Sequence, residues 1–241
     1  MIELLSSNQL LLIATALVFL LASIALNIYD KHNYSVFFLV ASGLSIFSFA
    51  ALLDPFINMW DERFHALVAK NMMNNPFKPM LYNDPVVNVV YDRWDRSIVW
   101  LHKQPLFLWQ IALSFKLFGI SEFTLRLPSI VLFGATAYAI YRSGRLLVNQ
   151  QVGYLASVLF ISSFYMLELV AGRQQLDVND AAFSGYVSLS IWCFLKYQHS
   201  KNKKWLYLIG LFSGAAILCK WLVGLFVYLI WGIFKMLNRE W

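Results

Sequence analysis

The chain is predicted to be an all-α, polytopic transmembrane helical bundle with about seven spans and with interfacial helices in a long first outer loop. Its 241 residues are 60% hydrophobic and 13% charged, which is too apolar for an ordinary soluble domain. The apolar residues gather in runs of about 20, the length that crosses the hydrocarbon core of a bilayer. Helices are expected because a backbone in contact with lipid must satisfy its hydrogen bonds within its own segment.

Seven apolar segments account for the predicted spans. In chain order they are Leu10–Ile28, Ser35–Leu53, Leu127–Leu147, Val152–Ala171, Val178–Leu195, Trp205–Cys219 and Trp221–Met236. The first follows a head with one acid and no base, which is unlike a signal peptide, so it is kept as a helix. The last two are short and meet at Lys220, and a tilted or partly re-entrant pair is the alternative for them.

An eighth apolar segment, Pro105–Gly119, decides the orientation of the bundle. If it does not span, the bases of the short loops share one side, which the positive-inside rule assigns to the cytoplasm. These bases are Lys31, Arg142, Arg145, Lys196, Lys201, Lys203, Lys204, Lys235 and Arg239. If it spans, this bias is lost. We therefore interpret Pro105–Gly119 as an interfacial helix. The net charge of +6 then requires no nucleic-acid partner, because the bases serve orientation.

These segments divide the chain into three parts. Residues 1–53 form two N-terminal transmembrane helices, residues 54–126 form an outer-face loop, and residues 127–241 contain the remaining transmembrane helices. The loop contains seven of the thirteen acids of the chain. Between Glu62 and Met73, apolar residues recur at helical spacing beside polar ones. This pattern predicts a helix that lies flat on the membrane.

Two adjacent carboxylates near the start of the loop are the candidate catalytic residues. Asp61 and Glu62 follow the second predicted span and precede the amphipathic helix. Acids at a helix N-terminus also stabilise the helix dipole, and this structural interpretation stays open. A carboxylate at the membrane surface can instead take a proton from an acceptor hydroxyl.

Three basic residues are the candidate phosphate ligands. Lys103 offers a compact positive charge that suits a phosphate, although snorkelling near a helix end is the alternative. Arg173 lies in a second short outer loop, on the same predicted side as Asp61 and Lys103. Lys220 separates two apolar runs. A lysine there is a functional candidate because charge is unfavourable within a membrane, and a simple outer turn explains it nearly as well.

Several short motifs, taken in order, resemble the polyprenyl-phosphate glycosyltransferases of the GT-C class, and are similar to the aminoarabinose transferase and protein O-mannosyltransferase families. The family patterns include Asp-Glu-x-x-Tyr, Lys-Pro-Pro-Leu-x-Tyr-Trp, Arg-Leu-Pro-Ser and Thr-Lys-Gly. The matching stretches here are Asp61-Glu62-Arg63-Phe64, Lys103-Gln104-Pro105-Leu106-Phe107-Leu108-Trp109, Arg126-Leu127-Pro128-Ser129, Leu176-Asp177-Val178 and Cys219-Lys220-Trp221. The resemblance extends from about Leu53 to the C-terminus.

This resemblance implies transfer of a sugar from a polyprenyl-phosphate carrier to a lipid, glycan or protein acceptor at the outer face of the membrane. It implies that Asp61 is the catalytic base and that Lys103 and Arg173 bind the carrier phosphate. His102 and Asp177 match positions that bind a divalent metal in some members, so a metal is the one cofactor considered.

The chain departs from the family pattern at three places. Gln104 replaces a proline, Phe64 replaces a tyrosine, and Pro85–Val99 resembles an insertion. The identity of the acceptor is therefore not indicated. Members of those families are much longer, so the chain is expected to correspond to an N-terminal half.

Three functional classes remain from the sequence. The favoured one is a glycosyltransferase, or a fragment of one, integral to the bacterial inner (plasma) membrane with its active site on the outer face. Its partners would be a polyprenyl-phosphate-linked sugar donor, membrane lipids and an acceptor that the sequence does not name. A transporter is the second class, because charges within a membrane also line substrate paths. A non-catalytic subunit or truncated relative is the third.

Overall fold

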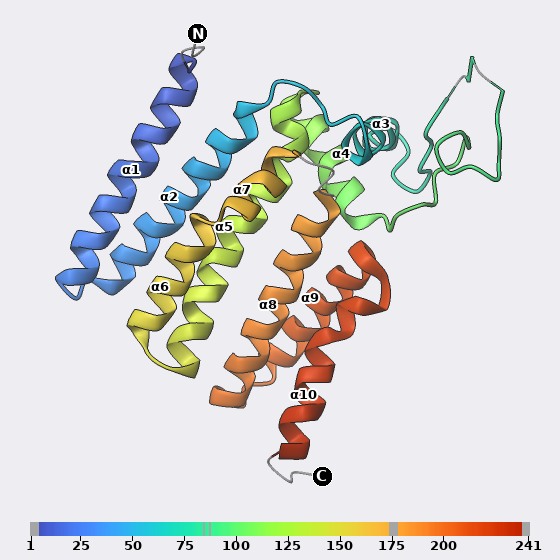
Figure 1. Cartoon of the computed structure of the whole chain (residues 1–241). Helices are drawn as coiled ribbons and strands as arrows, with labels where there is room; N and C mark the ends of the chain where they lie inside the picture. Colours follow the sequence, from blue (N-terminus) through green and yellow to red (C-terminus); the bar gives the residue numbers. More distant parts are fainter. Residues whose placement is uncertain (1–4, 84, 87, 174–177, 238–241) are drawn as a thin grey trace.

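The computed structural model describes residues 5–83, 85–86, 88–173 and 178–237. Within these ranges every regular element is helical, apart from one isolated antiparallel bridge between Met80 and Val99. The predicted all-α class is therefore confirmed. Long helices lie side by side in a bundle, and two shorter helices with an irregular loop extend from one of its ends (Figure 1).

The first two helices form a hairpin. Helix α1 (Ser7–Ile28) is capped by Ser6 and turns into α2 (His32–Leu53). Polar contacts between them are few and buried, such as the bond from the Ser42 hydroxyl to the Ala16 carbonyl (2.8 Å). The outward side chains of α1 are mostly large and apolar, which is the surface that lipid requires.

Two shorter helices lie in the connection between α2 and the third long helix. Helix α3 (Asp61–Met72) and helix α4 (Leu106–Phe118) form where the sequence predicted them. They pack on one another through buried apolar residues. At 13 residues, α4 is shorter than the roughly 20 residues that a transmembrane helix needs, which agrees with its interpretation as a helix that does not span.

Helix α5 (Glu122–Leu147) runs through the middle of the bundle and contacts α2, α4, α6 and α8. It begins five residues before the predicted Leu127, because Ser121 and Thr124 form a capping box. Such a cap satisfies backbone N–H groups that the first turn leaves unpaired. The polar first turn of α5 could not be predicted from apolar runs alone.

The predicted span Val152–Ala171 is broken in the structure. It consists of α6 (Gln150–Ile161) and α7 (Phe164–Ala171), which are bent by 46° at Ser162 and Ser163. Helix α6 crosses α5 very closely, since a β-carbon at Gly153 would lie 2.3 Å from the Tyr141 carbonyl oxygen.

The C-terminal helices form a second hairpin. Helix α8 (Val178–Ser200) is followed by α9 (Lys204–Lys220), a short 3-10 turn η1 (Trp221–Leu225) and α10 (Phe226–Leu237). The chain reverses after Lys220, and the hydroxyls of Ser213 and Tyr228 lie 3.1 Å apart across the hairpin.

The number of spans is lower by length and composition than the sequence predicted. Four helical stretches are long and apolar enough to cross a membrane, or five if the bent pair α6–α7 counts as one span. The four are Ser7–Ile28, His32–Leu53, Glu122–Leu147 and Lys204–Leu237, the last by the summed length of α9, η1 and α10, which reverse direction after Lys220. Helix α8 falls outside this set because it carries Asn179, Asp180 and several serines. The predicted count of about seven is thus not confirmed.

The helices alternate in direction, so their connections gather at two ends (Figure 1). One end carries the α1–α2, α5–α6 and α8–α9 turns, and the basic loop residues predicted to share a side lie there, while Arg239 is outside the described residues. The opposite end carries the described residues between α2 and α5, the end of α7, the start of α8 and the α9–η1 junction. We call it the loop end. Which end faces the cytoplasm stays a prediction.

Candidate functional site

A buried arginine organises the loop end. Arg126, on the second turn of α5, has no exposed surface. Its Nε and Nη2 donate to the two carboxylate oxygens of Glu62, at 2.8 and 3.1 Å. Its terminal nitrogens also donate to the carbonyls of Ala51, Asp54 and Phe56 at 2.8 to 3.0 Å. Carbonyls at the end of α2 lack helical partners, so one side chain both caps α2 and fixes the approach to α3.

Glu62 is enclosed by this arrangement. Its side chain is fully buried, and Oε2 also accepts the backbone N–H of Asn58 at 2.8 Å. The backbone of Gly172, at the end of α7, lies directly against the same carboxylate. Glu62 was a candidate catalytic residue from the sequence, but its oxygens are already used by Arg126 and the backbone.

Asp61, the neighbouring acid, lies in a different environment. Its side chain is 14% exposed, and Oδ2 lies 3.6 Å from the Nζ of Lys103, whose side chain is 20% exposed. Asp61 is the first residue of α3 and Lys103 lies just before α4. The structure therefore brings these two candidate residues together. The distance is longer than a hydrogen bond, so the contact is an ion pair.

Aromatic packing positions the segment that carries Lys103. The ring of His102 stacks on Trp94, with centroids 4.6 Å apart and planes at 15°. Trp94 in turn meets Phe64 of α3 at 4.8 Å. These contacts join the segment before α4 to the buried Phe64 of α3, so that Asp61 and Lys103 belong to one packed unit.

The junction after α9 closes on the same segment. With its amide oriented to suit both neighbours, Gln104 donates to the Cys219 carbonyl at 3.0 Å and accepts from the indole N–H of Trp221. The side chain of Asn179, on the first turn of α8, donates to that same carbonyl at 2.9 Å. The Gln104 departure from the family pattern thus makes contacts that a proline could not make.

Lys220 lies beside an acid of its own. Its ammonium group pairs with Asp180 of α8 and lies 6.0 Å from the ring centre of Phe183. The Lys220 side chain is 47% exposed. The structure therefore links this predicted phosphate ligand to α8 and gives it a carboxylate partner at the loop end.

Arg173 is shared between two acids. It lies 3.8 Å from the Asp54 carboxylate at the end of α2 and 3.7 Å from the Glu168 carboxylate of α7. All three side chains are partly exposed. The Asp54 carbonyl also accepts from Arg126, so this group adjoins the Arg126–Glu62 pair.

The predicted metal ligands are not brought together in the described part of the chain. Asp177 lies outside the described residues, and His102 packs its ring against Trp94 and Trp100. Among the residues that the structure describes, no group of three or more His, Cys, Asp or Glu side chains is suited to a metal. A divalent metal stays a prediction, and no step below uses one.

Sequence reasoning missed the role of Arg126, which it treated only as part of a motif. A signal was present, because a full charge one residue before a long apolar run is unfavourable in lipid unless it is paired. The partner, 64 positions away at Glu62, could not be named from local sequence.

Comparison with known proteins gives the family. The model of the dolichyl-phosphate-mannose-protein mannosyltransferase family matches residues 102–241, which is more than half of the chain. The chain belongs to this family. An uncharacterized protein of Aquifex aeolicus (strain VF5) is 28% identical over 167 residues, which cover 67% of this chain and 30% of that protein.

A solved structure shows the same fold. ArnT from Cupriavidus metallidurans in the apo state is similar with a TM-score of 0.66 and 19% identity, over 86% of this chain and 36% of that one. The resemblance to the GT-C class drawn from the sequence is thereby confirmed for family and fold. The chain spans about a third of the length of each of these two proteins.

Proposed function

We propose that this chain forms the part of a membrane glycosyltransferase that activates the acceptor and binds the donor phosphate. The reaction would move a sugar from a polyprenyl-phosphate carrier to a hydroxyl-bearing acceptor at the outer face of the membrane. Family membership supports the reaction class. The observation that carries the proposal is the partly buried pair of Asp61 and Lys103, 3.6 Å apart at the loop end.

Asp61 supplies the base in this proposal. Its carboxylate takes the proton of the acceptor hydroxyl while the hydroxyl oxygen bonds to the anomeric carbon of the sugar. The bond from that carbon to the phosphate oxygen breaks, and its electron pair leaves with the carrier phosphate. General-base catalysis of this kind contributes about 10²–10⁴-fold to a rate.

Lys103 supplies the charge that meets the leaving phosphate. An ammonium group on a flexible stem is a compact point charge and suits phosphate without requiring a fixed geometry. Arg173 and Lys220 are proposed as secondary phosphate contacts, since Arg173 lies between two carboxylates and the Lys220 side chain is 47% exposed, where water screens its charge.

Glu62 and Arg126 would act as a frame rather than as reacting groups. Their buried ion pair fixes the first turn of α3 against the ends of α2 and α7. Asp61 is adjacent to Glu62 in this turn, so the Arg126–Glu62 ion pair also fixes the backbone from which the Asp61 side chain projects. We therefore assign Glu62 to positioning and keep Asp61 alone as the proposed base.

The test is sugar transfer by the intact protein in proteoliposomes, with dolichyl phosphate mannose and undecaprenyl phosphate mannose as donors. Asp61→Asn should lower the turnover by about 10²–10⁴-fold while the protein still inserts and unfolds at the same temperature. The control is Asp92→Asn, which changes an exposed acid of the same loop and should leave turnover unchanged. Near-normal turnover in Asp61→Asn would exclude it as the base.

A further inference from the structure

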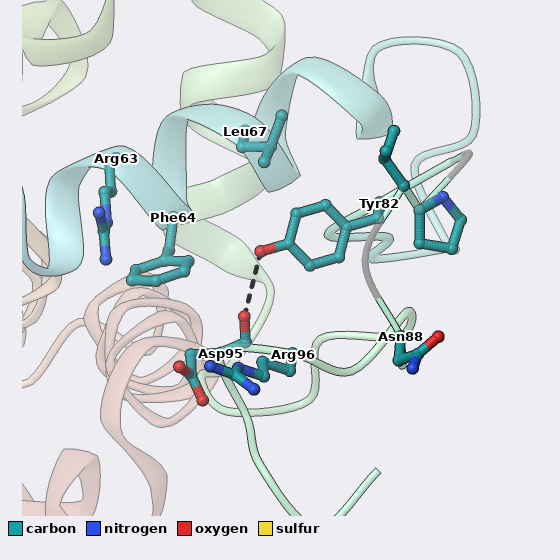
Figure 2. Close-up of a pocket in the computed structure, with 9 residues that line it drawn as sticks. Arg63, Phe64, Leu67, Tyr82, Asn88, Asp95 and Arg96 are labelled. Carbon is teal, nitrogen blue, oxygen red and sulfur yellow. Dashed lines mark hydrogen bonds between the residues drawn. The ribbon is translucent and has the colours of Figure 1, made fainter. Parts of the chain in front are cut away.

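A pocket of about 580 Å³ lies between α3 and the irregular loop that precedes α4. Figure 2 shows Arg63, Phe64 and Leu67 of α3 on one wall and Tyr82, Asp95 and Arg96 of the irregular loop on the other. The Tyr82 hydroxyl donates to the Asp95 carbonyl at 3.1 Å, which braces the loop wall. Much of this wall comes from the segment Pro85–Val99 that departs from the family pattern.

The pocket lies close to the proposed base. Asp61 and Phe64 are three residues apart on α3, so their side chains share one helix face with β-carbons roughly 5–6 Å apart. Phe64 also packs on Trp94, which stacks on His102 beside Lys103. A ligand in the pocket would therefore lie about one helical turn from the Asp61–Lys103 pair.

The charge of the pocket is positive. Asp95 is the acid among its described lining residues, and Arg93 from outside the pocket donates two hydrogen bonds to it, at 2.9 and 3.1 Å. These bonds hold the pKa of Asp95 below its usual range, with Arg96 adding to the effect. Since Arg93 compensates Asp95, the charges of Arg63 and Arg96 remain in excess. Arg63 is oriented by packing over the Phe64 ring at 4.6 Å.

The remaining lining is apolar and aromatic. Leu67, Pro85 and Val86 contribute it, together with the Tyr82 ring. Aromatic and aliphatic surface beside a few oriented polar groups is what binds a ring-shaped ligand with one charged substituent. Guanidinium groups bind phosphate and carboxylate with paired hydrogen bonds.

We propose that this pocket is the acceptor subsite, and that it binds a headgroup in which a phosphate or carboxylate is attached to a sugar ring. The inference rests on the proposed function, because an acceptor must bring its hydroxyl to Asp61. The anionic group would lie between Arg63 and Arg96. The ring would lie against Tyr82 and Leu67, and its free hydroxyl would point along α3 toward Asp61.

The test measures binding of soluble probes to the intact protein in phosphatidylcholine nanodiscs. Glucose 1-phosphate should bind at least about tenfold more tightly than neutral methyl glucoside and than inorganic phosphate. Arg63→Ala and Arg96→Ala should each weaken glucose 1-phosphate binding roughly tenfold, as expected for a lost charge-assisted hydrogen bond. Arg63→Lys and Arg96→Lys should recover part of it.

Two further variants make the test specific. Lys70→Ala removes an exposed charge from the same helix outside the pocket and should leave the affinity unchanged. Arg93→Ala should weaken binding although Arg93 does not line the pocket, because Asp95 then opposes the anion. Equal affinity for the charged and neutral sugars, or the same loss in Lys70→Ala as in Arg63→Ala, would overturn the proposal.

A second series of discs identifies the source of the anion. If phosphatidylglycerol added to the disc competes with glucose 1-phosphate, the pocket binds headgroups borne by lipids. If it does not compete, the pocket binds a soluble sugar anion. Both results support an anion subsite.

The failure of this inference is distinguishable from the failure of the proposed function. Asp61→Asn should lower transfer by about 10²–10⁴-fold and leave probe binding intact. If Asp61→Asn instead retains transfer, the base assignment fails. If Asp61→Asn behaves as expected but Arg63→Ala changes neither probe affinity nor the KM for an acceptor, only the pocket inference fails.

Discussion

The backbone of Gly172 lies against the carboxylate of Glu62, so closely that a β-carbon at position 172 would come within 2.4 Å of Oε1. Gly172 also has a φ of +68°, a left-handed conformation that ends α7. Two independent constraints therefore require glycine here, one from the backbone and one from the buried acid. Through this contact the end of α7 is fitted to the first turn of α3.

Gly172→Ala is accordingly expected to destabilise the protein. The strained backbone and the collision with Glu62 together should cost about 1–3 kcal/mol, seen as a lower midpoint of thermal unfolding in detergent. Gly210→Ala is the control, because a β-carbon there meets nothing within 4 Å and alanine favours a helix. An unchanged midpoint in Gly172→Ala would mean that the two helices do not meet as described.

The buried pair of Arg126 and Glu62 predicts a large loss of stability when either partner is removed. Glu62→Gln leaves a buried charge uncompensated, for which about 3–5 kcal/mol is typical. Arg126→Lys keeps the charge but cannot reach both oxygens of Glu62 and three carbonyls, so it should not restore stability. Chemical unfolding of the reconstituted protein measures both.

The matched control is an ion pair at the surface of the protein. Arg93 pairs with Asp95 at the surface, with its side chain 54% exposed, and exposed pairs contribute about 0–1 kcal/mol. Arg93→Ala should therefore barely move the unfolding midpoint. Equal losses in Arg93→Ala and Glu62→Gln would contradict the assigned role of the buried pair.

The two ends of the bundle should lie on opposite sides of the membrane. In a background with Cys193 and Cys219 replaced, single cysteines at Asn83 and at Asn202 report the loop end and the opposite end. An impermeant thiol reagent applied to intact cells should label Asn83→Cys and spare Asn202→Cys. After the cells are opened, both should react. Equal labelling in intact cells would mean that α4 spans or that insertion is mixed.

Much of the helical framework follows from local sequence, because an apolar run in lipid has few alternatives to a helix. The bounds of α2 and α4 were predicted within a few residues for that reason. The break between α6 and α7 was missed, since Ser162 and Ser163 lie within an otherwise continuous apolar run. The reversal after α9 was predicted from two apolar segments that meet at Lys220, with a tilted or partly re-entrant pair as the alternative, and Ser213 contacts Tyr228 across it.

The candidate site was predictable only in part. Asp61 and Lys103 were identified by residue type, position and family resemblance, and the structure brings them together. The pairing of Lys220 with Asp180 and the burial of Glu62 were not predictable. Both depend on which side chain of a distant helix faces them, which a single sequence does not encode locally. The pocket beside α3 could not be predicted from the sequence for the same reason.

The last prediction separates the three basic candidates. Lys103→Ala should weaken binding of undecaprenyl phosphate to the reconstituted protein, because a phosphate that leaves water needs a nearby cation to offset its desolvation. Lys103→Arg keeps the charge and should recover part of the affinity.

Arg173→Ala should have a smaller effect, since the two carboxylates of Asp54 and Glu168 already neutralise this side chain. Lys220→Ala should have the smallest effect on binding, because the Lys220 side chain is 47% exposed and water screens its charge. Binding is measured by titration with the carrier lipid in nanodiscs, and Lys116→Ala, an exposed base at the end of α4, controls for the loss of one positive charge. If Lys103→Ala and Arg173→Ala both bind the carrier like the unaltered protein, then Lys103 and Arg173 are interfacial anchors, and the donor phosphate must be bound elsewhere.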